Sequence, residues 1–276
     1  MNSLNLPELL LQTLSACRPA AAFIHNETLS FTREKVEYKG MNDMVSYVDR
    51  EAEKLLVAAL RKILPQAGFI TEEGTEGDYN AAARIPDALH WIIDPLDGTT
   101  NFVHGIPHFC VSVALAMGNT PVLGVIIDVM RNEEFYGCTG GGAFLNGKPI
   151  HVSPNTDFSS SLPATGFPYN TEGHAAIYTR ILAYLMTRCH GLRRFGSAAL
   201  DMAWVACGRL DAYFEKRIQP WDIAAGMVIV REAGGSCSTF KNDDDCLFAR
   251  EIVCGGAVKE DLRQVVAGHW YPEEQV

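Results

Sequence analysis

The sequence predicts a mixed α/β fold in which a largely antiparallel α+β half precedes an alternating α/β half. Between residues 92 and 150, apolar runs of strand length are separated by short turn sequences. After residue 155, strand-like and helix-like segments alternate, which is typical of α/β architectures. The 276 residues suffice for one large domain or two interlocked halves, and no linker rich in Pro, Gly or Ser divides them. We therefore expect two subdomains, residues 1–155 and 156–276, packed as one unit.

Two amphipathic helices open the chain. Leucines recur at helical spacing from Leu6, with Pro7 near the start, and predict a helix that continues to about Phe31. A second apolar stripe, with charges on its other face, predicts a helix over residues 45–63, which Pro65 follows. We expect a short strand and then a polar surface loop to follow, over residues 67–70 and 75–88.

Residues 91–102 (WIIDPLDGTTNF) form the most informative stretch. Their apolar run predicts a buried strand, which we expect Pro95 to end. Asp94 and Asp97 lie three residues apart, and Gly98-Thr99-Thr100 can open a helix whose free N–H groups face an anion. Two hard oxygen ligands beside a phosphate-sized anion site suit a divalent metal and a phosphate ester.

Two other interpretations of this stretch are weaker. Turn chemistry alone explains an isolated Asp-Gly after a strand, but here a strand, two acids and a helix start fall within twelve residues. Haloacid-dehalogenase-type phosphatases also carry Asp-Gly-Thr, but their two aspartates are closer together and lie near the N-terminus. The three-residue spacing at position 94 therefore excludes that class.

Further strands and a hairpin follow the motif. Asn146-Gly147 between two short apolar segments is a strong hairpin signal. Residues 140–142 (GGG) lack the Gly-Lys-Ser/Thr ending of a P-loop, so a turn beside that hairpin is favoured over a phosphate loop. The predicted strands are residues 110–116, 122–129, 134–138, 143–145 and 148–150.

In the second half, glycines mark the ends of helical segments, as Gly208 and Gly234-Gly235 do. The predicted strands are residues 162–165, 192–195, 210–215 and 252–254. The predicted helices are residues 174–188, 197–207, 222–233 and 260–267.

Composition limits the partners and the compartment. A net charge of −10 and a pI near 5.3 argue against nucleic acid bound through a broad basic face, although bound cations can still attract a phosphorylated substrate. The eight cysteines form no C-x-x-C pair, which favours reduced, buried thiols over a zinc site. With no long apolar run and no signal-peptide pattern, we expect no membrane partner and a cytoplasmic location.

Four further acidic residues fit the central motif, and each has a structural alternative. Glu72 follows a short strand, where its carboxylate can bind a metal or simply face solvent. Asp49 follows Ser46 at capping-box spacing, and that role is compatible with a functional one. Asp222 lies where a helix N-cap is expected. Glu215 ends a strand, where a carboxylate can stand at the mouth of a site.

Taken together, these residues resemble the inositol monophosphatase family of magnesium-dependent, lithium-sensitive phosphatases. The resemblance rests on residues 91–102, 221–235 and 39–49. Thr71-Glu72-Glu73 is similar to the family's Gly-Glu-Glu, with Thr71 in the glycine's place and the ligand kept. The resemblance covers nearly the whole chain. It implies a layered αβαβα sandwich, of the type shared with fructose bisphosphatases, with the active site between the two subdomains.

The resemblance implies two to three Mg²⁺ ions in the active site. Glu72, Asp94 and the Leu96 carbonyl would hold the first, and Asp94, Asp97 and Asp222 the second. Glu72 and waters would hold a third, looser ion. Such carboxylate and carbonyl oxygens are the ligands that Mg²⁺ prefers.

The resemblance also assigns the catalytic and substrate-binding residues. Asp49 and Thr99, together with Glu72, would position and deprotonate the attacking water. Because acids and metals suffice for this chemistry, we interpret His104 and His108 as loop or interface residues. The implied substrate contacts, with the phosphate at the first two backbone N–H groups, are Gly98, Thr99, Asp97, Ala198, Glu215 and Asp222.

We expect the protein to be a homodimer that hydrolyses myo-inositol monophosphate. Relatives in the superfamily act on fructose 1,6-bisphosphate, histidinol phosphate or 3′-phosphoadenosine nucleotides. Relatives specific for nucleotides or histidinol phosphate tend towards Lys in place of Thr100, and Glu215 suits a polyol because it accepts hydrogen bonds from hydroxyls. A non-catalytic role as a partner subunit is the alternative from another class, since some bacterial relatives interact with the transcription machinery. The complete set of metal ligands argues against it.

Overall fold

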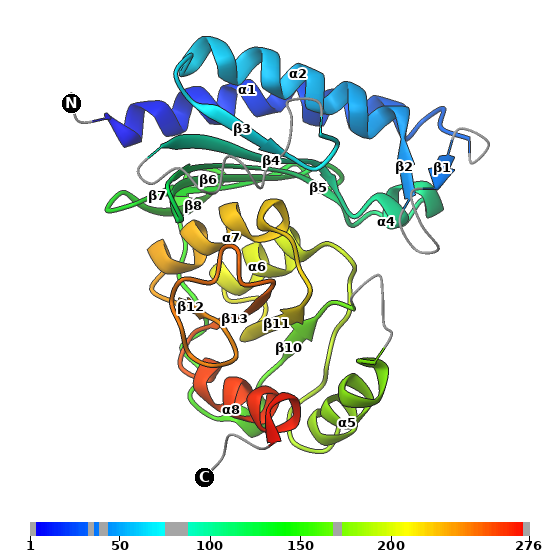
Figure 1. Ribbon diagram of the computed structural model, residues 1–276, viewed down its shortest axis with the longest axis vertical. Helices are drawn as coiled ribbons and strands as arrows, with labels where there is room; N and C mark the ends of the chain where they lie inside the picture. The colour runs from blue at the N-terminus through cyan, green and yellow to red at the C-terminus, as the bar shows by residue number, and fades with distance from the viewer. Residues whose placement is uncertain (1–3, 33–35, 39–43, 75–87, 168–172, 273–276) are drawn as a thin grey trace.

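The computed structural model stacks five layers in the order αβαβα (Figure 1). It describes residues 4–32, 36–38, 44–74, 88–167 and 173–272. A helical pair, a seven-stranded sheet, a second helical pair, a four-stranded sheet and a third helical pair follow one another down the molecule. This arrangement confirms the predicted fold class. The three pairs are α1 (Leu6–Glu27) with α2 (Tyr47–Ile63), α6 (Ala198–Ala206) with α7 (Pro220–Glu232), and α5 (Ala175–Leu185) with α8 (Lys259–Trp270).

The seven-stranded sheet has the order β3-β4-β5-β6-β7-β8-β9. Only β3 and β4 pair in parallel, and all other neighbours are antiparallel, as predicted for this half. Asn146 and Gly147 both have positive φ, 48° and 80°, which is the backbone that the predicted tight hairpin requires. The strands are β3 (Gly68–Thr71), β4 (Leu89–Asp97), β5 (Cys110–Met117), β6 (Thr120–Asp128), β7 (Glu133–Cys138), β8 (Gly142–Leu145) and β9 (Lys148–Pro149).

The four-stranded sheet has the order β10-β11-β13-β12 and mixes both orientations. β10 and β11 are parallel, whereas β13 is antiparallel to both β11 and β12. The edge strand β12 was not predicted. The strands are β10 (Pro163–Thr165), β11 (Ala212–Lys216), β12 (Ser236–Ser238) and β13 (Glu251–Gly255).

The large sheet is buried on both faces, and β5 shows how its residues divide. Val111, Val113 and Leu115 belong to the core beneath α1 and α2. Cys110 and Ala114 alternate with them and face the core around α6 and α7. Such a continuous apolar run is typical of a strand covered on both sides. The small side chains on the second face let α7 approach closely.

Gly124 of β6 marks that close approach, and we predict that Gly124→Ala destabilises the fold. A Cβ at this position would lie 2.5 Å from the carbonyl oxygen of Ala225 in α7, so backbone has to move. Overpacking of this kind costs about 1–3 kcal/mol, which urea unfolding measures. Gly191→Ala is the matched control, because its Cβ would meet only side-chain atoms at 3.2 Å or more. Equal stability of the two variants would contradict the prediction.

The structure corrects three of the predicted elements in particular. α1 ends at Glu27, because the chain then turns and packs the Phe31 ring edge-on against Phe102 at 4.8 Å. Val45 belongs to β2 (Met44–Ser46), which pairs with β1 (Val36–Tyr38). The predicted strand over 192–195 is reduced to a single bridge between Arg193 and Ala164. Residues 39–43 and 75–87 lie outside the described residues.

The triple glycine forms the predicted turn. The backbone N–H groups of Gly140 and Gly142 donate to the Glu232 carboxylate at 3.0 and 2.8 Å, which ties the turn to the end of α7. All eight cysteines are free thiols, and six of them are buried. Among the described residues, no helix combines the length and apolar character needed to cross a membrane.

Candidate active site

The motif at residues 91–102 forms the end of β4 and the short helix α4 (Thr99–His104). The register between β4 and β5 shifts between Asp94 and Asp97, so this end of the strand is irregular. Pro95 lies within the irregularity, and β4 continues through it to Asp97, which corrects the prediction that the proline ends the strand. Gly98 then caps α4 with φ 100°, and a Cβ there would lie 3.0 Å from the His108 carbonyl oxygen.

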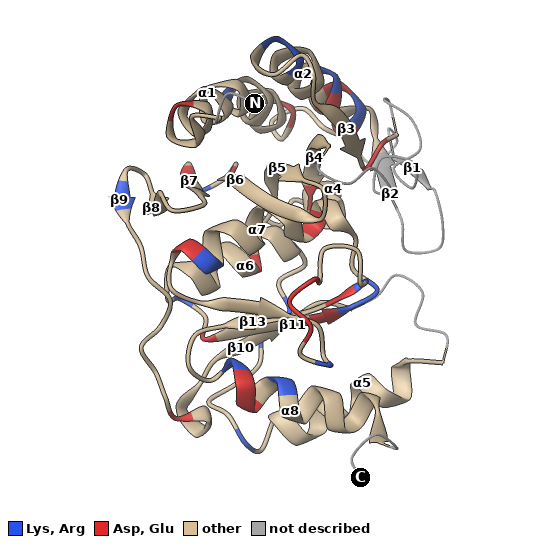
Figure 2. Cartoon of the chain, turned by 60° about the vertical axis from the view of Figure 1, so that its left-hand side comes forward, with Lys and Arg blue, Asp and Glu red and all other residues tan. Residues whose placement is uncertain are grey.

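The structure brings the predicted acids together. Carboxylate oxygens of Asp94, Asp97 and Asp222 lie within 4.8 Å of one another, and Glu72 shares a side-chain hydrogen bond with Asp94. Figure 2 shows acidic positions in red at the end of β4, beside α4. Glu72 comes from the loop after β3, and Asp222 from the first turn of α7.

Burial and mutual repulsion disfavour the ionised forms of these groups. The pKa of Asp94 is raised well above its usual value by burial and then by the charges of Glu72 and Asp97. Burial and the charges of Asp97 and Glu72 raise the pKa of Asp222 in the same way. A divalent cation neutralises such a set of oxygen donors, so these residues fit the Mg²⁺ ligands that the resemblance implied.

Asp49 and Thr99 meet beside the cluster. Asp49 forms the predicted capping box at the start of α2, where its Oδ2 accepts from the backbone N–H and the hydroxyl of Ser46 at 2.8 and 2.7 Å. Its Oδ1 accepts from the Thr99 hydroxyl at 3.0 Å, and the same hydroxyl lies 3.0 Å from the Leu96 carbonyl oxygen. Burial raises the pKa of Asp49, against the hydrogen bonds from Ser46 and Thr99.

Asp97 joins β4 to the start of α6. Its Oδ2 accepts from the Ser197 hydroxyl and from the Ala199 N–H, each at 2.7 Å. A backbone hydrogen bond from Ala198 also favours its ionised form. The backbone N–H of Ala198, a predicted substrate contact, therefore interacts with Asp97 in this structure.

The sequence suggested Asp222 as the N-cap of α7, and the structure shows that it is not. Gln219 is the N-cap and Asp222 is the third residue of the helix, where its Oδ2 accepts from the Gln219 N–H at 2.8 Å. Asp222 therefore holds the helix start with one oxygen in the same way that Asp49 does.

Glu215 is a residue of β11 and lies near the acid cluster without being part of it. Burial raises its pKa to about 7, a hydrogen bond from Tyr213 and the charge of Arg194 oppose that shift, and the charge of Asp97 adds to it. A Cβ at Gly166 would lie 2.1 Å from a Glu215 oxygen, so any larger residue there would force this carboxylate to move. Sequence reasoning missed Gly166 as part of the site. The only available signal was its place directly after a strand.

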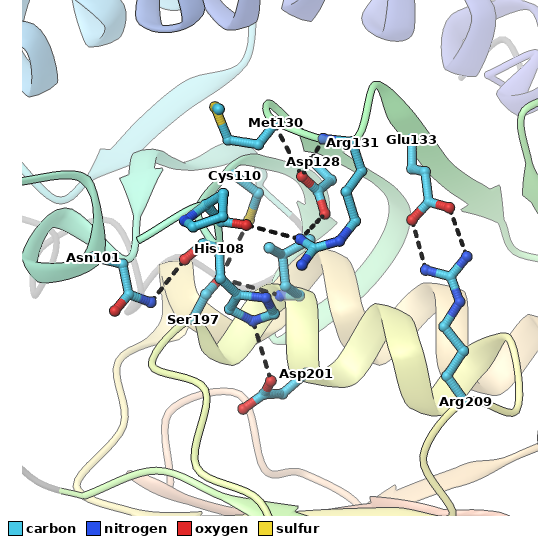
Figure 3. A network of polar contacts seen from close by, with 12 residues as sticks. Asn101, His108, Cys110, Asp128, Met130, Arg131, Glu133, Ser197, Asp201 and Arg209 are labelled. Carbon is cyan, nitrogen blue, oxygen red and sulfur yellow. Dashed lines mark hydrogen bonds and ion pairs between the residues drawn. The ribbon is translucent and has the colours of Figure 1, made fainter. Parts of the chain in front are cut away.

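His108 is buried, and its ring points toward Asp201 of α6 (Figure 3). Its Nε2 lies 3.4 Å from Asp201 Oδ1, and its ring contacts those of Phe195 and Trp204. Burial and the charge of Arg131 lower its pKa to about 4, so the imidazole is neutral near pH 7. The predicted loop position of His108 is confirmed. His104 is the exposed last residue of α4 rather than a loop residue.

Comparison with known proteins identifies the family of the chain. A model of the inositol monophosphatase family matches residues 7–271. Nus factor SuhB of Salmonella typhimurium is 43% identical over 222 residues, 79% of each chain. Inositol-1-monophosphatase of Rhizobium meliloti is 41% identical over 234 residues, 84% of this chain and 86% of that one. The solved structure of inositol monophosphatase from Anabaena superposes with a TM-score of 0.83 at 33% identity, covering 95% of this chain and 96% of that one. The chain therefore belongs to the inositol monophosphatase family.

Proposed function

We propose that the protein hydrolyses a phosphate monoester with the help of Mg²⁺, and that its substrate is myo-inositol monophosphate. The observation that carries this proposal is the cluster of Asp94, Asp97 and Asp222, whose oxygens lie within 4.8 Å of one another. Membership of the family supports the phosphatase activity, and the relative named inositol-1-monophosphatase supports the substrate.

In this proposal the acids divide between the metal positions. Glu72, Asp94 and the Leu96 carbonyl would hold one Mg²⁺, and Asp94, Asp97 and Asp222 would hold a second. Glu72 with waters would hold a third. A metal bound there would lower the pKa of a water and offset charge on the leaving oxygen. The site then lies between the two proposed subdomains, residues 1–155 and 156–276, because Asp222 comes from α7 and the other ligands from β4 and the loop after β3.

Asp49 and Thr99 place the attacking water and take its proton. The Thr99 hydroxyl donates to Asp49, so its oxygen can accept a proton from water as its own proton passes to the carboxylate. The raised pKa of Asp49 makes it a better base than an exposed aspartate. The backbone N–H groups of Gly98 and Thr99 bind the phosphate, and Glu72 assists the water.

The other candidate function is a partner-binding role without catalysis. It is favoured by one observation, the name Nus factor that the Salmonella relative carries. Glu72 and Asp94 argue for catalysis, since neither holds the start of a helix as Asp49 and Asp222 do, and folding alone would not retain their charge.

Phosphate release from a substrate panel with Mg²⁺ separates these functions. The panel contains inositol phosphates, sugar phosphates including fructose 1,6-bisphosphate, histidinol phosphate and 3′-phosphoadenosine nucleotides. We expect the highest kcat/KM for inositol monophosphate, no turnover in excess chelator, full recovery on adding Mg²⁺, and inhibition by Li⁺. Turnover in excess chelator refutes the metal mechanism, and no turnover of any substrate favours the partner-binding role. The homodimer stays a prediction, and analytical sedimentation of the protein in solution measures its oligomeric state.

We predict that Glu215→Gln lowers kcat/KM for the polyol substrate only. Ionised Glu215 accepts hydrogen bonds from ring hydroxyls, and the amide removes the charge from that acceptor. One charge-assisted hydrogen bond is worth about 1.5–3 kcal/mol, so kcat/KM for inositol phosphate should fall roughly 10- to 150-fold. An aryl phosphate without hydroxyls is the control substrate and should be spared. Equal losses on both substrates would move Glu215 into the catalytic machinery.

A further inference from the structure

Sulfur groups from β12 and from the segment that follows it lie close to Met227 of α7. Cys237 of β12 and Cys254 of β13 are directly opposite in the antiparallel register. Cys246 Sγ lies 4.0 Å from Met227 Sδ, and Cys237 Sγ lies 4.0 Å from the Met227 carbonyl oxygen. The proposed phosphatase chemistry uses none of these groups.

The geometry of the opposed pair suits a disulfide. Directly opposite residues of an antiparallel pair have Cα atoms about 4.5–5.5 Å apart and side chains on one face. Disulfides span Cα separations of about 4.4–6.8 Å, so the Cα spacing of an opposed pair lies within the range that a bond between Cys237 and Cys254 requires.

Cys237 is buried, with 2% of its surface exposed, and its environment favours the thiolate. It forms part of the wall of a surface cavity of about 550 Å³, together with Arg231, Asp244 and Asp245. Its pKa is lowered by the hydrogen bond from Cys254, against burial, and by the charges of Arg231 and Lys259. All eight cysteines are described, and the other seven have raised pKa values. Thiolates, not thiols, react with oxidants.

We propose that Cys237 and Cys254 are a peroxide-oxidisable dithiol, with Cys237 as the attacking and Cys254 as the resolving residue. The Cys237 thiolate attacks one oxygen of hydrogen peroxide, forming an S–O bond and releasing hydroxide as the O–O bond breaks. The Cys254 sulfur then attacks the sulfenic sulfur, forming the S–S bond and breaking the S–O bond. The thiol proton leaves with the hydroxyl group as water, so peroxide takes two electrons from the dithiol.

The disulfide would link the edge strand β12 of the smaller sheet covalently to β13. β12 is three residues long and pairs only with β13, so a bond between them ties down the last strand of the order β10-β11-β13-β12. Because the pair lies outside the acid cluster, the proposal does not depend on the phosphatase function.

Peroxide treatment of the reduced full-length protein tests the proposal. Remaining thiols are alkylated and the protein is analysed as an intact mass and as peptides. We expect two of the eight cysteines to escape alkylation and one linked peptide pair to contain Cys237 and Cys254. Cys237→Ser should slow thiol loss at least about tenfold, because the low-pKa thiol is the reactive one. Cys254→Ser should stop at a sulfenic acid that a cyclic 1,3-dione captures.

Cys138→Ser is the matched control, a buried thiol in the other sheet that should leave the bridge intact. Arg231→Gln keeps both thiols and should slow oxidation, which serves as the test if Cys237→Ser does not fold. Eight alkylated cysteines after peroxide, a linked pair containing Cys246 instead of Cys254, or unchanged rates in both the Cys237→Ser and Arg231→Gln variants would overturn the proposal.

Discussion

Asp94→Asn is expected to abolish phosphatase activity in a protein that still folds. Asp94 Oδ1 accepts from the Leu96 N–H at 2.9 Å, and an asparagine oxygen can accept the same bond. The substitution removes one charge from both proposed metal positions, where electrostatic stabilisation is largest. We expect kcat/KM to fall by about a thousandfold or more, equivalent to roughly 4 kcal/mol. Phosphate release across a Mg²⁺ titration measures it, and an active variant with normal Mg²⁺ dependence would refute the assignment.

The same variant should be more stable than the parent when metal is withheld. Burial and neighbouring charges raise the pKa of Asp94 in the folded protein, so the fold favours its neutral form. The stability tied to that neutral form is present at low pH and is lost as pH rises through the raised pKa. Asparagine is neutral throughout. The Tm difference in chelator should therefore be positive at pH 7 and vanish as pH falls to about 4, the ordinary range of a carboxyl group.

Asp49→Asn should have the second-largest effect, a loss of about 10²- to 10⁴-fold in kcat, because it removes the base that accepts the Thr99 proton. Ser46→Ala is the matched control at the same helix start. It removes the cap hydroxyl, which costs about 0.5–2 kcal/mol of stability, and with it one of the two hydrogen bonds from Ser46 to Asp49, but it keeps the bond between Asp49 and Thr99. Urea unfolding and kcat together separate the two roles. Similar kcat losses in both variants would mean that Asp49 acts only through the helix.

The sequence predicted those parts of the site that depend on local rules. The capping box at Asp49 follows from a three-residue spacing, and the hairpin follows from the Asn146-Gly147 pair. The acids at 94 and 97 could be recognised because they follow an apolar strand. Each of these signals lies within a few residues of the group that it positions, so no knowledge of the tertiary fold was needed.

The missing parts depend on contacts between distant segments. The hydrogen bond from Ser197 to Asp97 joins residues 100 positions apart, and no sequence pattern near either residue predicts it. The burial of His108 results from rings at Phe195 and Trp204. The prediction for Pro95 failed for another reason. A proline ends a regular ladder because it has no N–H to donate, but here the register has already shifted at its position.

The two capping carboxylates at Asp49 and Asp222 have a consequence for how relatives evolve. Each holds the first turn of a long helix with one oxygen, so purifying selection for folding alone retains both of them. A descendant that abandoned turnover for a scaffolding role would be expected to keep these two acids. Glu72 caps no helix, and the turn at Asp94 needs only a neutral acceptor. Drift at Glu72 and Asp94 is therefore the better marker of lost catalysis in this lineage, and both acids are intact here.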